Sequence, residues 1–220
     1  MAKNRIDPRK PPTAVIRGVT PTTQPVAAAY TAGMTDLELI QRIRNTALLH
    51  GDFTLRSGRK SRYYLDKYLF ETKPDILLAL AERFARHVDG VDRLAGAELG
   101  GIPLVTATSI KTGKPTVLIR NQKKSYGTSK QLEGVLNRGD RVLMLEDVAT
   151  TGGQVLEATN VMRDAGAEVV KIVAAIDRQE GARQNIETAG FRFATLLTSS
   201  DLGIHEAAGD QPHTTTSSQS

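Results

Sequence analysis

A strand-like apolar run that leads into two acids and two glycines constrains the fold of this chain more than any other feature. Residues 142–145 are apolar, Glu146 and Asp147 follow at once, and a Thr-Thr-Gly-Gly turn opens a helical pattern near Gln154. In open α/β sheets, ligands bind just beyond the carboxyl ends of the strands. Free backbone amides at a helix N-terminus suit a phosphate group. The segment therefore predicts a strand–loop–helix unit that binds a phosphorylated ligand.

The two acids narrow the class of ligand. Carboxylates beside a phosphate cradle would repel a bare polyphosphate, so they need sugar hydroxyls or Mg²⁺ as partners. A phosphorylated sugar meets both requirements, with its phosphate on the loop and its hydroxyls on Glu146 and Asp147. The alternative is an ordinary strand–turn–helix junction capped by Asp147. That alternative explains the glycines, but it does not explain the acid pair followed by two threonines.

The surrounding pattern alternates helices and strands. Helices are expected after Thr35, with Leu37, Ile40, Ile43 and Ala47 on one face, after Pro74, with Ile76, Leu77, Leu80, Ala81 and Phe84 buried, and near 102–112 and 154–165. Strands are expected at 93–95, 116–119, 142–145 and 169–176. This alternation predicts one α/β domain with a parallel sheet, preceded by a helical and turn-rich cap.

Composition excludes several classes of protein. The chain has 220 residues and no cysteine, which excludes a disulfide scaffold and a thiolate metal site. No apolar run approaches the roughly 20 residues that span a bilayer, so no membrane association is expected. The four histidines show no spacing typical of a metal pair on one helix. Zinc chemistry is therefore not expected.

The two ends are expected to be disordered tails around a folded domain at 34–205. Residues 1–33 are rich in proline, which breaks helices, and carry five basic residues against one acid. Most of the net charge of +5 thus lies in one tail, so the total says little about nucleic acid. Residues 206–220 are polar throughout. No uninterrupted apolar segment follows the charged start, as a secretory signal requires, and a cytoplasmic location is expected.

The segment at 142–154 resembles the phosphoribosyl diphosphate (PRPP) signature of type I phosphoribosyltransferases. The resemblance implies a Rossmann-like parallel sheet core with a small N-terminal hood and a flexible catalytic loop. It also implies that the two acids hold the ribose hydroxyls and that the loop binds the 5-phosphate. The residues that it assigns to PRPP here are Glu146, Asp147, Val148, Ala149, Thr150, Thr151, Gly152, Gly153 and Gln154.

Residues 53–66 resemble the N-terminal substrate segment of orotate phosphoribosyltransferases. Taken alone, the segment is typical of a solvated hairpin. The resemblance implies that Arg56 lies near the diphosphate, and that Tyr64 and Leu65 face the pyrimidine ring. Many family members have lysine at position 56, so only the positive charge carries over.

Residues 94–103 resemble the diphosphate-binding turn of the same family. Small residues after a strand allow a diphosphate to approach the backbone amides closely. A tight strand-to-helix turn is the alternative interpretation, and both can hold. Some relatives have a lysine where this chain has Gly100, so this position supplies no charge.

Residues 120–128 resemble the catalytic loop of these enzymes. A charge run by itself is usually a solvated face. The resemblance implies that Arg120, Lys124 and Tyr126 bind PRPP, and that Arg120 and Lys124 act in catalysis together with Asp147. Asn121 stands where the family has a lysine, which removes one donor to the diphosphate.

Residues 175–181 end a further strand and resemble the segment that selects orotate. A guanidinium is well suited to planar, bidentate recognition of a carboxylate. The resemblance therefore implies that Arg178 meets the orotate carboxylate, with Tyr64, Leu65 and Thr150 completing the orotate site. An ion pair between Arg178 and a nearby acid is the alternative.

Together these segments predict an orotate phosphoribosyltransferase activity in pyrimidine (UMP) biosynthesis, which makes orotidine 5′-monophosphate and diphosphate from orotate and PRPP. The expected cofactor is Mg²⁺, held mainly through PRPP rather than by protein ligands, and the expected assembly is a homodimer whose loop acts in trans. Two alternatives remain open. One is a transferase for another nucleobase, and the other is a non-catalytic regulator that senses PRPP and binds nucleic acid. Asn121 and the basic tail favour the regulator, whereas Lys124, Tyr126 and Arg178 argue against it.

Overall fold

The computed structural model describes residues 33–54, 60–121 and 131–204. The predicted tails fall outside these residues except at Gly33, and so do Arg56, Lys124 and Tyr126. Within the described part of the chain, no helix is long and apolar enough to cross a membrane.

A six-stranded sheet forms the centre of the molecule, with strand order β5-β4-β3-β6-β7-β8. Its strands are β3 (Arg93–Ala97), β4 (Thr116–Ile119), β5 (Leu132–Gly134), β6 (Arg141–Ala149), β7 (Glu168–Asp177) and β8 (Phe193–Thr198). Five of them run parallel, and β5 pairs antiparallel with β4 at one edge. The predicted parallel α/β core is confirmed, with one antiparallel edge strand that the sequence pattern did not indicate.

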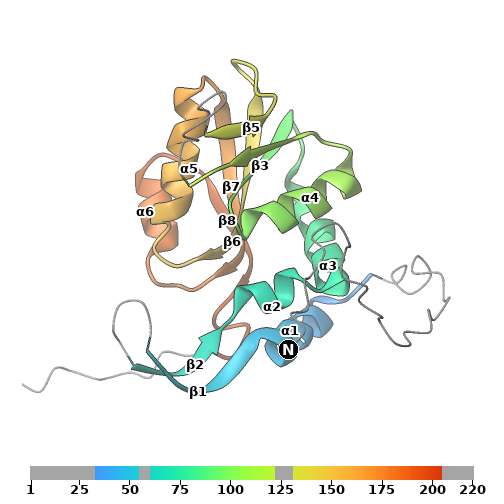
Figure 1. Cartoon of the computed structure of the whole chain (residues 1–220), viewed down its shortest axis with the longest axis vertical. Coiled ribbons are helices and arrows are strands. Elements are labelled where there is room, and N and C mark those ends of the chain that lie inside the picture. Colours follow the sequence, from blue (N-terminus) through green and yellow to red (C-terminus); the bar gives the residue numbers. More distant parts are fainter. Residues whose placement is uncertain (1–32, 55–59, 122–130, 205–220) are drawn as a thin grey trace, which may run out of the picture. The chain divides into compact units, whose positions relative to one another are not determined.

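Helices cover both faces of this sheet. They are α3 (Pro74–Phe84), followed by a short 3-10 helix η2 (Ala85–His87), α4 (Gly101–Thr112), α5 (Gly153–Asp164) and α6 (Ala182–Thr188). Figure 1 shows α3 and α4 on one side of the sheet and α5 and α6 on the other. The helices predicted near 102–112 and 154–165 are confirmed, whereas α6 and β8 were not predicted.

Strand β6 lies between β3 and β7 and is buried on both faces. Leu143 and Leu145 pack into the core on the α3–α4 side, and Val142 and Met144 pack into the core on the α5–α6 side. A continuous apolar run is typical of a parallel strand covered by helices on both faces. The strand extends beyond the predicted end at residue 145, because β7 continues alongside it as far as Ala149. The acid pair therefore lies within a hydrogen-bonded strand.

Four elements that precede α3 in the chain form a hood beneath the sheet (Figure 1). Its elements are α1 (Asp36–Ala47), an antiparallel hairpin of β1 (Leu48–Thr54) and β2 (Lys60–Leu65), and the short helix α2 (Lys67–Glu71). Thr35 and Glu38 form the capping box that starts α1. The buried face of α1 carries Leu39, Ile43 and Ala47. The prediction that Leu37 belongs to this face is wrong, because its side chain is 64% exposed.

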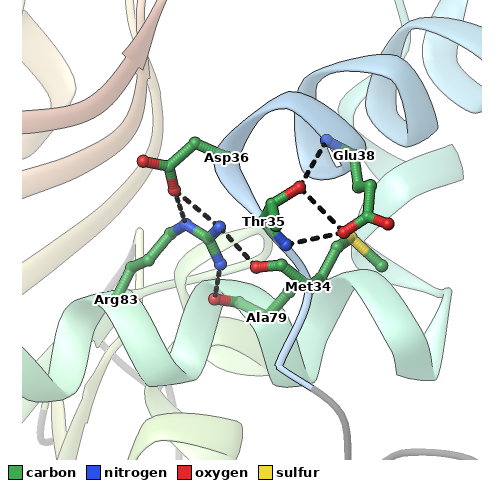
Figure 2. A network of polar contacts seen from close by, with 6 residues as sticks. All are labelled: Met34, Thr35, Asp36, Glu38, Ala79 and Arg83. Carbon is green, nitrogen blue, oxygen red and sulfur yellow. Dashed lines mark hydrogen bonds and ion pairs between the residues drawn. The ribbon is translucent and has the colours of Figure 1, made fainter.

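One buried arginine fastens the start of the hood to the helix that covers the sheet (Figure 2). Arg83 of α3 donates hydrogen bonds to Asp36 Oδ1, to the carbonyl oxygen of Met34 and to the carbonyl oxygen of Ala79, each at 2.8 Å. Arg83 is 6% exposed, so its charge requires these partners. The network fixes the first turn of α1 on α3.

Candidate active site

The loop between β6 and α5 forms a cradle at the carboxyl end of the sheet. Gly152 precedes α5 with φ of +81°, a conformation that side chains rarely adopt, and a Cβ there would lie 3.0 Å from Ile186 Cγ1. Helix α5 begins at Gly153, and the first amides of a helix have no acceptor within that helix. This turn can therefore offer backbone N–H groups to an anion.

A cavity of about 1030 Å³ opens above this loop. Four elements contribute its lining: the β1–β2 hairpin, the end of β6, the loop into α5, and the segment after β7. The lining residues are Leu49, Phe53, Thr54, Tyr64, Glu146, Val148, Ala149, Thr150, Thr151, Gly152, Gly153, Gln154, Val155, Arg178 and Glu180. Most of the residues that the sequence patterns assign to PRPP and orotate thus meet around one hollow.

Two aromatic rings form one wall of the cavity. The ring centroids of Phe53 and Tyr64 lie 5.6 Å apart, and Tyr64 is 43% exposed. The ring planes are tilted by 34°, and together they provide an apolar surface for a planar ligand. Leu65, the next residue, instead packs its side chain against the apolar core. The strand alternation of β2 separates the two residues, and Leu65 does not line the cavity.

Arg178 follows β7 and is distant in sequence from the loop between β6 and α5, but the two segments are hydrogen-bonded to each other. Its backbone N–H donates to the carbonyl oxygen of Ala149 at 2.9 Å. Its guanidinium Nη2 lies 2.9 Å from Glu180 Oε1, and both side chains line the cavity. The ion pair that was one alternative for Arg178 is present, and it holds the guanidinium at the cavity wall.

The turn between β3 and α4 packs tightly against the acid pair. A Cβ on Gly96 would lie 2.5 Å from the carbonyl oxygen of Gly101, and a Cβ on Gly100 would lie 1.5 Å from Asp147 Oδ2. The small residues of this turn are therefore required by packing, as the second interpretation of the segment proposed. The Glu98–Leu99 peptide bond in this turn is cis.

The start of the predicted catalytic loop connects to this turn. The Asn121 N–H donates to Glu98 Oε1 at 2.7 Å, and Gln154 Nε2 donates to Asn121 Oδ1 at 3.4 Å. Arg120 lies at the end of β4, where its Nη1 is 3.7 Å from Glu133 Oε1, and it does not line the cavity. Asn121 thus links the β3–α4 turn to the first turn of α5.

A buried cluster of charges lies at the carboxyl end of β6, where Asp147, unlike Glu146, does not line the cavity. Asp147 Oδ2 is 2.6 Å from Lys67 Nζ, and the Asp147 side chain is 3% exposed. Burial, together with the charge of Asp147, raises the pKa of Glu146 to about 8, although Lys67 opposes this shift. Burial and the same neighbour raise the pKa of Glu71 to about 9. At neutral pH the protonated forms of Glu71 and Glu146 are favoured.

Sequence reasoning missed Lys67 and Glu71. They are four residues apart on α2, which places them on one face of the helix, and this spacing was the available signal. Nothing in the sequence pairs them with a strand 80 residues further along the chain. Among the residues that the structure describes, no group of three or more His, Cys, Asp or Glu side chains is arranged to hold a metal ion.

A parallel α/β sheet with a glycine-bounded phosphate cradle and a pair of acids on its central strand defines a phosphoribosyltransferase, and comparison with known proteins agrees. The family model described as "Phosphoribosyl transferase domain" matches residues 68–195. An orotate phosphoribosyltransferase of Methanocella arvoryzae is 45% identical over 169 residues, which cover 76% of this chain and 97% of that protein. The chain belongs to the orotate phosphoribosyltransferase family.

Solved structures support the same assignment. The crystal structure of Mycobacterium tuberculosis orotate phosphoribosyltransferase in complex with Fe(III) dicitrate matches with a TM-score of 0.69 and 32% identity, over 76% of this chain and 98% of that chain. The complex of that protein with 5-phospho-alpha-D-ribosyl 1-diphosphate matches with a TM-score of 0.66 and 30% identity, over 76% of this chain and 98% of that chain.

Proposed function

We propose that this chain transfers the phosphoribosyl group of PRPP to orotate, which yields orotidine 5′-monophosphate and diphosphate in pyrimidine biosynthesis. The observation that carries this proposal is the cavity in which the phosphate loop, Glu146, Tyr64 and Arg178 meet from four separate elements. Each of these groups matches one part of the two substrates. The domain at 34–205 would contain this whole site.

The PRPP site would extend along the edge of the sheet. Residues 150–154 would bind the 5-phosphate through backbone amides and hydroxyls, as a helix N-terminus favours. Glu146 and Asp147 would accept hydrogen bonds from the ribose hydroxyls. The diphosphate would lie toward the β3–α4 turn, where the glycines leave the backbone uncovered. Arg56, Arg120, Lys124 and Tyr126 are the proposed side-chain donors to PRPP, and all but Arg120 lie outside the described residues.

The orotate site would lie between the aromatic wall and Arg178. The guanidinium would form a bidentate contact with the orotate carboxylate and exchange its present partner Glu180 for the substrate. Tyr64 would cover the pyrimidine ring, and Thr150 would contact its edge. Because the Leu65 side chain packs into the core, any contact of Leu65 with the ring would be made by its backbone.

In the reaction, the bond between the anomeric carbon and the diphosphate oxygen breaks, and a bond from the deprotonated orotate ring nitrogen to that carbon forms. Negative charge grows on the leaving diphosphate, so Lys124, Arg120 and Arg56 would stabilise the transition state. Positive charge grows on the ribose ring, which a carboxylate of the acid pair would favour. Closure of the catalytic loop would exclude the water that otherwise hydrolyses the activated sugar.

The proposed cofactor is Mg²⁺, which would arrive with PRPP and be held mainly by its diphosphate oxygens. Bound there, it would supply positive charge to the leaving group. Hard oxygen donors such as the substrate's own phosphates are the ligands that this ion prefers. The proposed assembly is a cytoplasmic homodimer in which the catalytic loop of one subunit closes over the site of the other.

The experiment that tests the function is the loss of orotate absorbance with PRPP and Mg²⁺ present, for the wild type and for Lys124→Ala. A rapid loss of orotate absorbance that is abolished in the variant supports three assignments together: the reaction, orotate as the nucleobase, and the catalytic role of the loop. If PRPP binds but orotate is not consumed, the orotate assignment fails. Consumption of another nucleobase would then favour the second transferase, and salt-dependent nucleic-acid binding by the folded domain would favour the regulator.

A further inference from the structure

A buried ion pair connects the hood to the strand that carries the proposed sugar site. Lys67 Nζ lies 2.6 Å from Asp147 Oδ2, with side-chain exposures of 31% and 3%. Lys67 begins α2, directly after the hairpin that supplies Tyr64 to the cavity. Of the cations that the structure describes, Lys67 is the one placed in an ion pair with Asp147.

Three carboxyl groups share this one ammonium. Glu71 is 1% exposed, and its carboxyl group lies beside that of Asp147. Glu146 is 8% exposed on the same strand as Asp147. Buried carboxylates repel one another, so the placement of a single cation decides which of them has a counter-charge. The direct contact of Lys67 is with Asp147.

The β3–α4 turn closes the cluster from the other side. An ideal Cβ on Gly100 would lie 1.5 Å from Asp147 Oδ2 and 2.9 Å from Glu71 Oε1. The two carboxyl groups therefore converge on the bare backbone of this turn, and no side chain fits there. Among the described residues, the cation that pairs with Asp147 comes from α2.

We propose that Lys67 is a positioning residue for PRPP, which orients the Asp147 carboxylate before PRPP binds and yields it to the ribose hydroxyls when PRPP binds. This inference rests on the proposed function, because that function assigns the sugar to Asp147. The ammonium stands on a long and flexible stem, so it can leave Asp147 and stay beside the turn at which the diphosphate is proposed to bind. The positive charge of Lys67 would then lie beside the negative charge of the diphosphate.

Removal of Lys67 would take away the ion-pair partner of Asp147. The titratable groups around Asp147 are Lys67 and Glu71 from α2 and Glu146 from β6, and the Tyr68 ring lies 5.4 Å from Lys67 Nζ. Of these groups, only Lys67 contributes a positive charge, so without it the Asp147 carboxylate would lose the contact at 2.6 Å that orients it. PRPP affinity would therefore fall.

The test is the dissociation constant of PRPP with Mg²⁺, measured by calorimetry without orotate. Lys67→Met should weaken binding at least about tenfold, because a buried charge partner is lost. Lys67→Arg should keep most of the affinity. The matched control is Lys111→Met, which removes the exposed ion pair with Glu82 at 3.0 Å and should bind PRPP as the wild type does.

Two results would overturn the inference: wild-type affinity in Lys67→Met, or a loss of affinity in Lys67→Arg as large as that in Lys67→Met. If Lys67→Met does not fold, the wild-type protein still tests the inference. The ¹⁵Nζ resonance of Lys67 should shift when PRPP is added, because Lys67 would leave Asp147. An unchanged resonance would refute this change of ion-pair partner. The proposed function fails separately. A wild type that binds PRPP in a Lys67-dependent manner but leaves orotate unchanged would refute the function and support the inference.

Discussion

The backbone N–H of Arg178 donates a hydrogen bond of 2.9 Å to the carbonyl oxygen of Ala149. Ala149 ends β6 at the start of the phosphate loop, and Arg178 follows the end of β7, the adjacent parallel strand. The proposed orotate anchor and the proposed phosphate cradle are thus joined through the backbone. A change of the Arg178 side chain should therefore leave the cradle intact.

Arg178→Lys is expected to change the KM values of the two substrates by different amounts. Lysine keeps the charge but loses the planar, bidentate contact, so the KM for orotate should rise roughly ten- to a hundredfold. The KM for PRPP should change little, because the Ala149 hydrogen bond comes from the backbone. Steady-state kinetics with each substrate varied in turn checks this. Arg183→Lys, on the exposed ion pair with Glu187 at 3.1 Å, is the control. An equal rise in both KM values would contradict the assignment of Arg178 to orotate.

Gly96→Ala is expected to destabilise the fold. The new Cβ would lie 2.5 Å from the carbonyl oxygen and 2.9 Å from the carbonyl carbon of Gly101, and neither backbone atom can move aside without displacing α4. The free energy of unfolding should fall by more than about 2 kcal/mol, because the added methyl group overpacks a tight backbone contact. Gly153→Ala is the matched control, because its Cβ would meet its nearest atom only at 3.8 Å. Urea unfolding of both variants checks the difference, and equal losses would show that the Gly96 contact is not restrictive.

Glu71→Gln is expected to flatten the dependence of stability on pH. The pKa of Glu71 rises from 4.5 to about 9 in the folded protein, because of burial and the charge of Asp147. The folded state therefore binds more protons than the unfolded state across this range, and the free energy of unfolding decreases as the pH rises through it. The wild type should melt several degrees lower at pH 9.5 than at pH 6, at roughly 2–4 °C for each kcal/mol. The variant should lose less and should be the more stable protein at pH 9.5.

Thermal melts of both proteins across this pH range provide the measurement. Glu187→Gln, at an exposed carboxylate on α6, should follow the wild type. Parallel curves for Glu71→Gln and the wild type would show that Glu71 ionises normally in the folded protein.

Arg83→Met is expected to loosen the hood. The substitution leaves the Met34 and Ala79 carbonyl oxygens without their donor and removes the partner of Asp36. Buried acceptors that lose a charged donor should decrease the free energy of unfolding by about 2–4 kcal/mol. Arg42→Met breaks the more exposed pair with Asp75 and should change it by less than about 1 kcal/mol. Chemical denaturation compares the two, and a similar effect of both would refute a special role for Arg83.

Strand β6 and the glycine loop before α5 could be predicted because their signals are local. An apolar run of strand length, two adjacent acids and a glycine turn before a helix occupy neighbouring positions in the chain, so residues 142–154 indicated the strand–loop–helix unit that the structure shows. Phosphate binding by this loop stays a prediction. The helix after Thr35 was also predicted, but its buried face was not assigned correctly. Leu37 and Leu39 begin two overlapping stripes on the same helix, and only packing against the core selects the stripe of Leu39.

Other features depend on pairing between distant segments. Strand β5 has three residues and too short a pattern to be recognised, and its position is determined by its hydrogen bonds to β4. Lys67 and Glu71 look like ordinary surface charges in sequence. Their burial beneath β6 arises because the hood folds back over the carboxyl edge of the sheet and brings α2 to Asp147.

The amino-acid sequence by itself determined the class of fold, the glycine loop and the acid pair, because each depends on residues that are close together along the chain. The tertiary structure decided which cation meets Asp147 and which carboxyl groups are buried beside this ion pair. Charge interactions in a buried cluster depend on distance in space and on exclusion of water, and both are set only when Lys67, Glu71 and Asp147 are packed together.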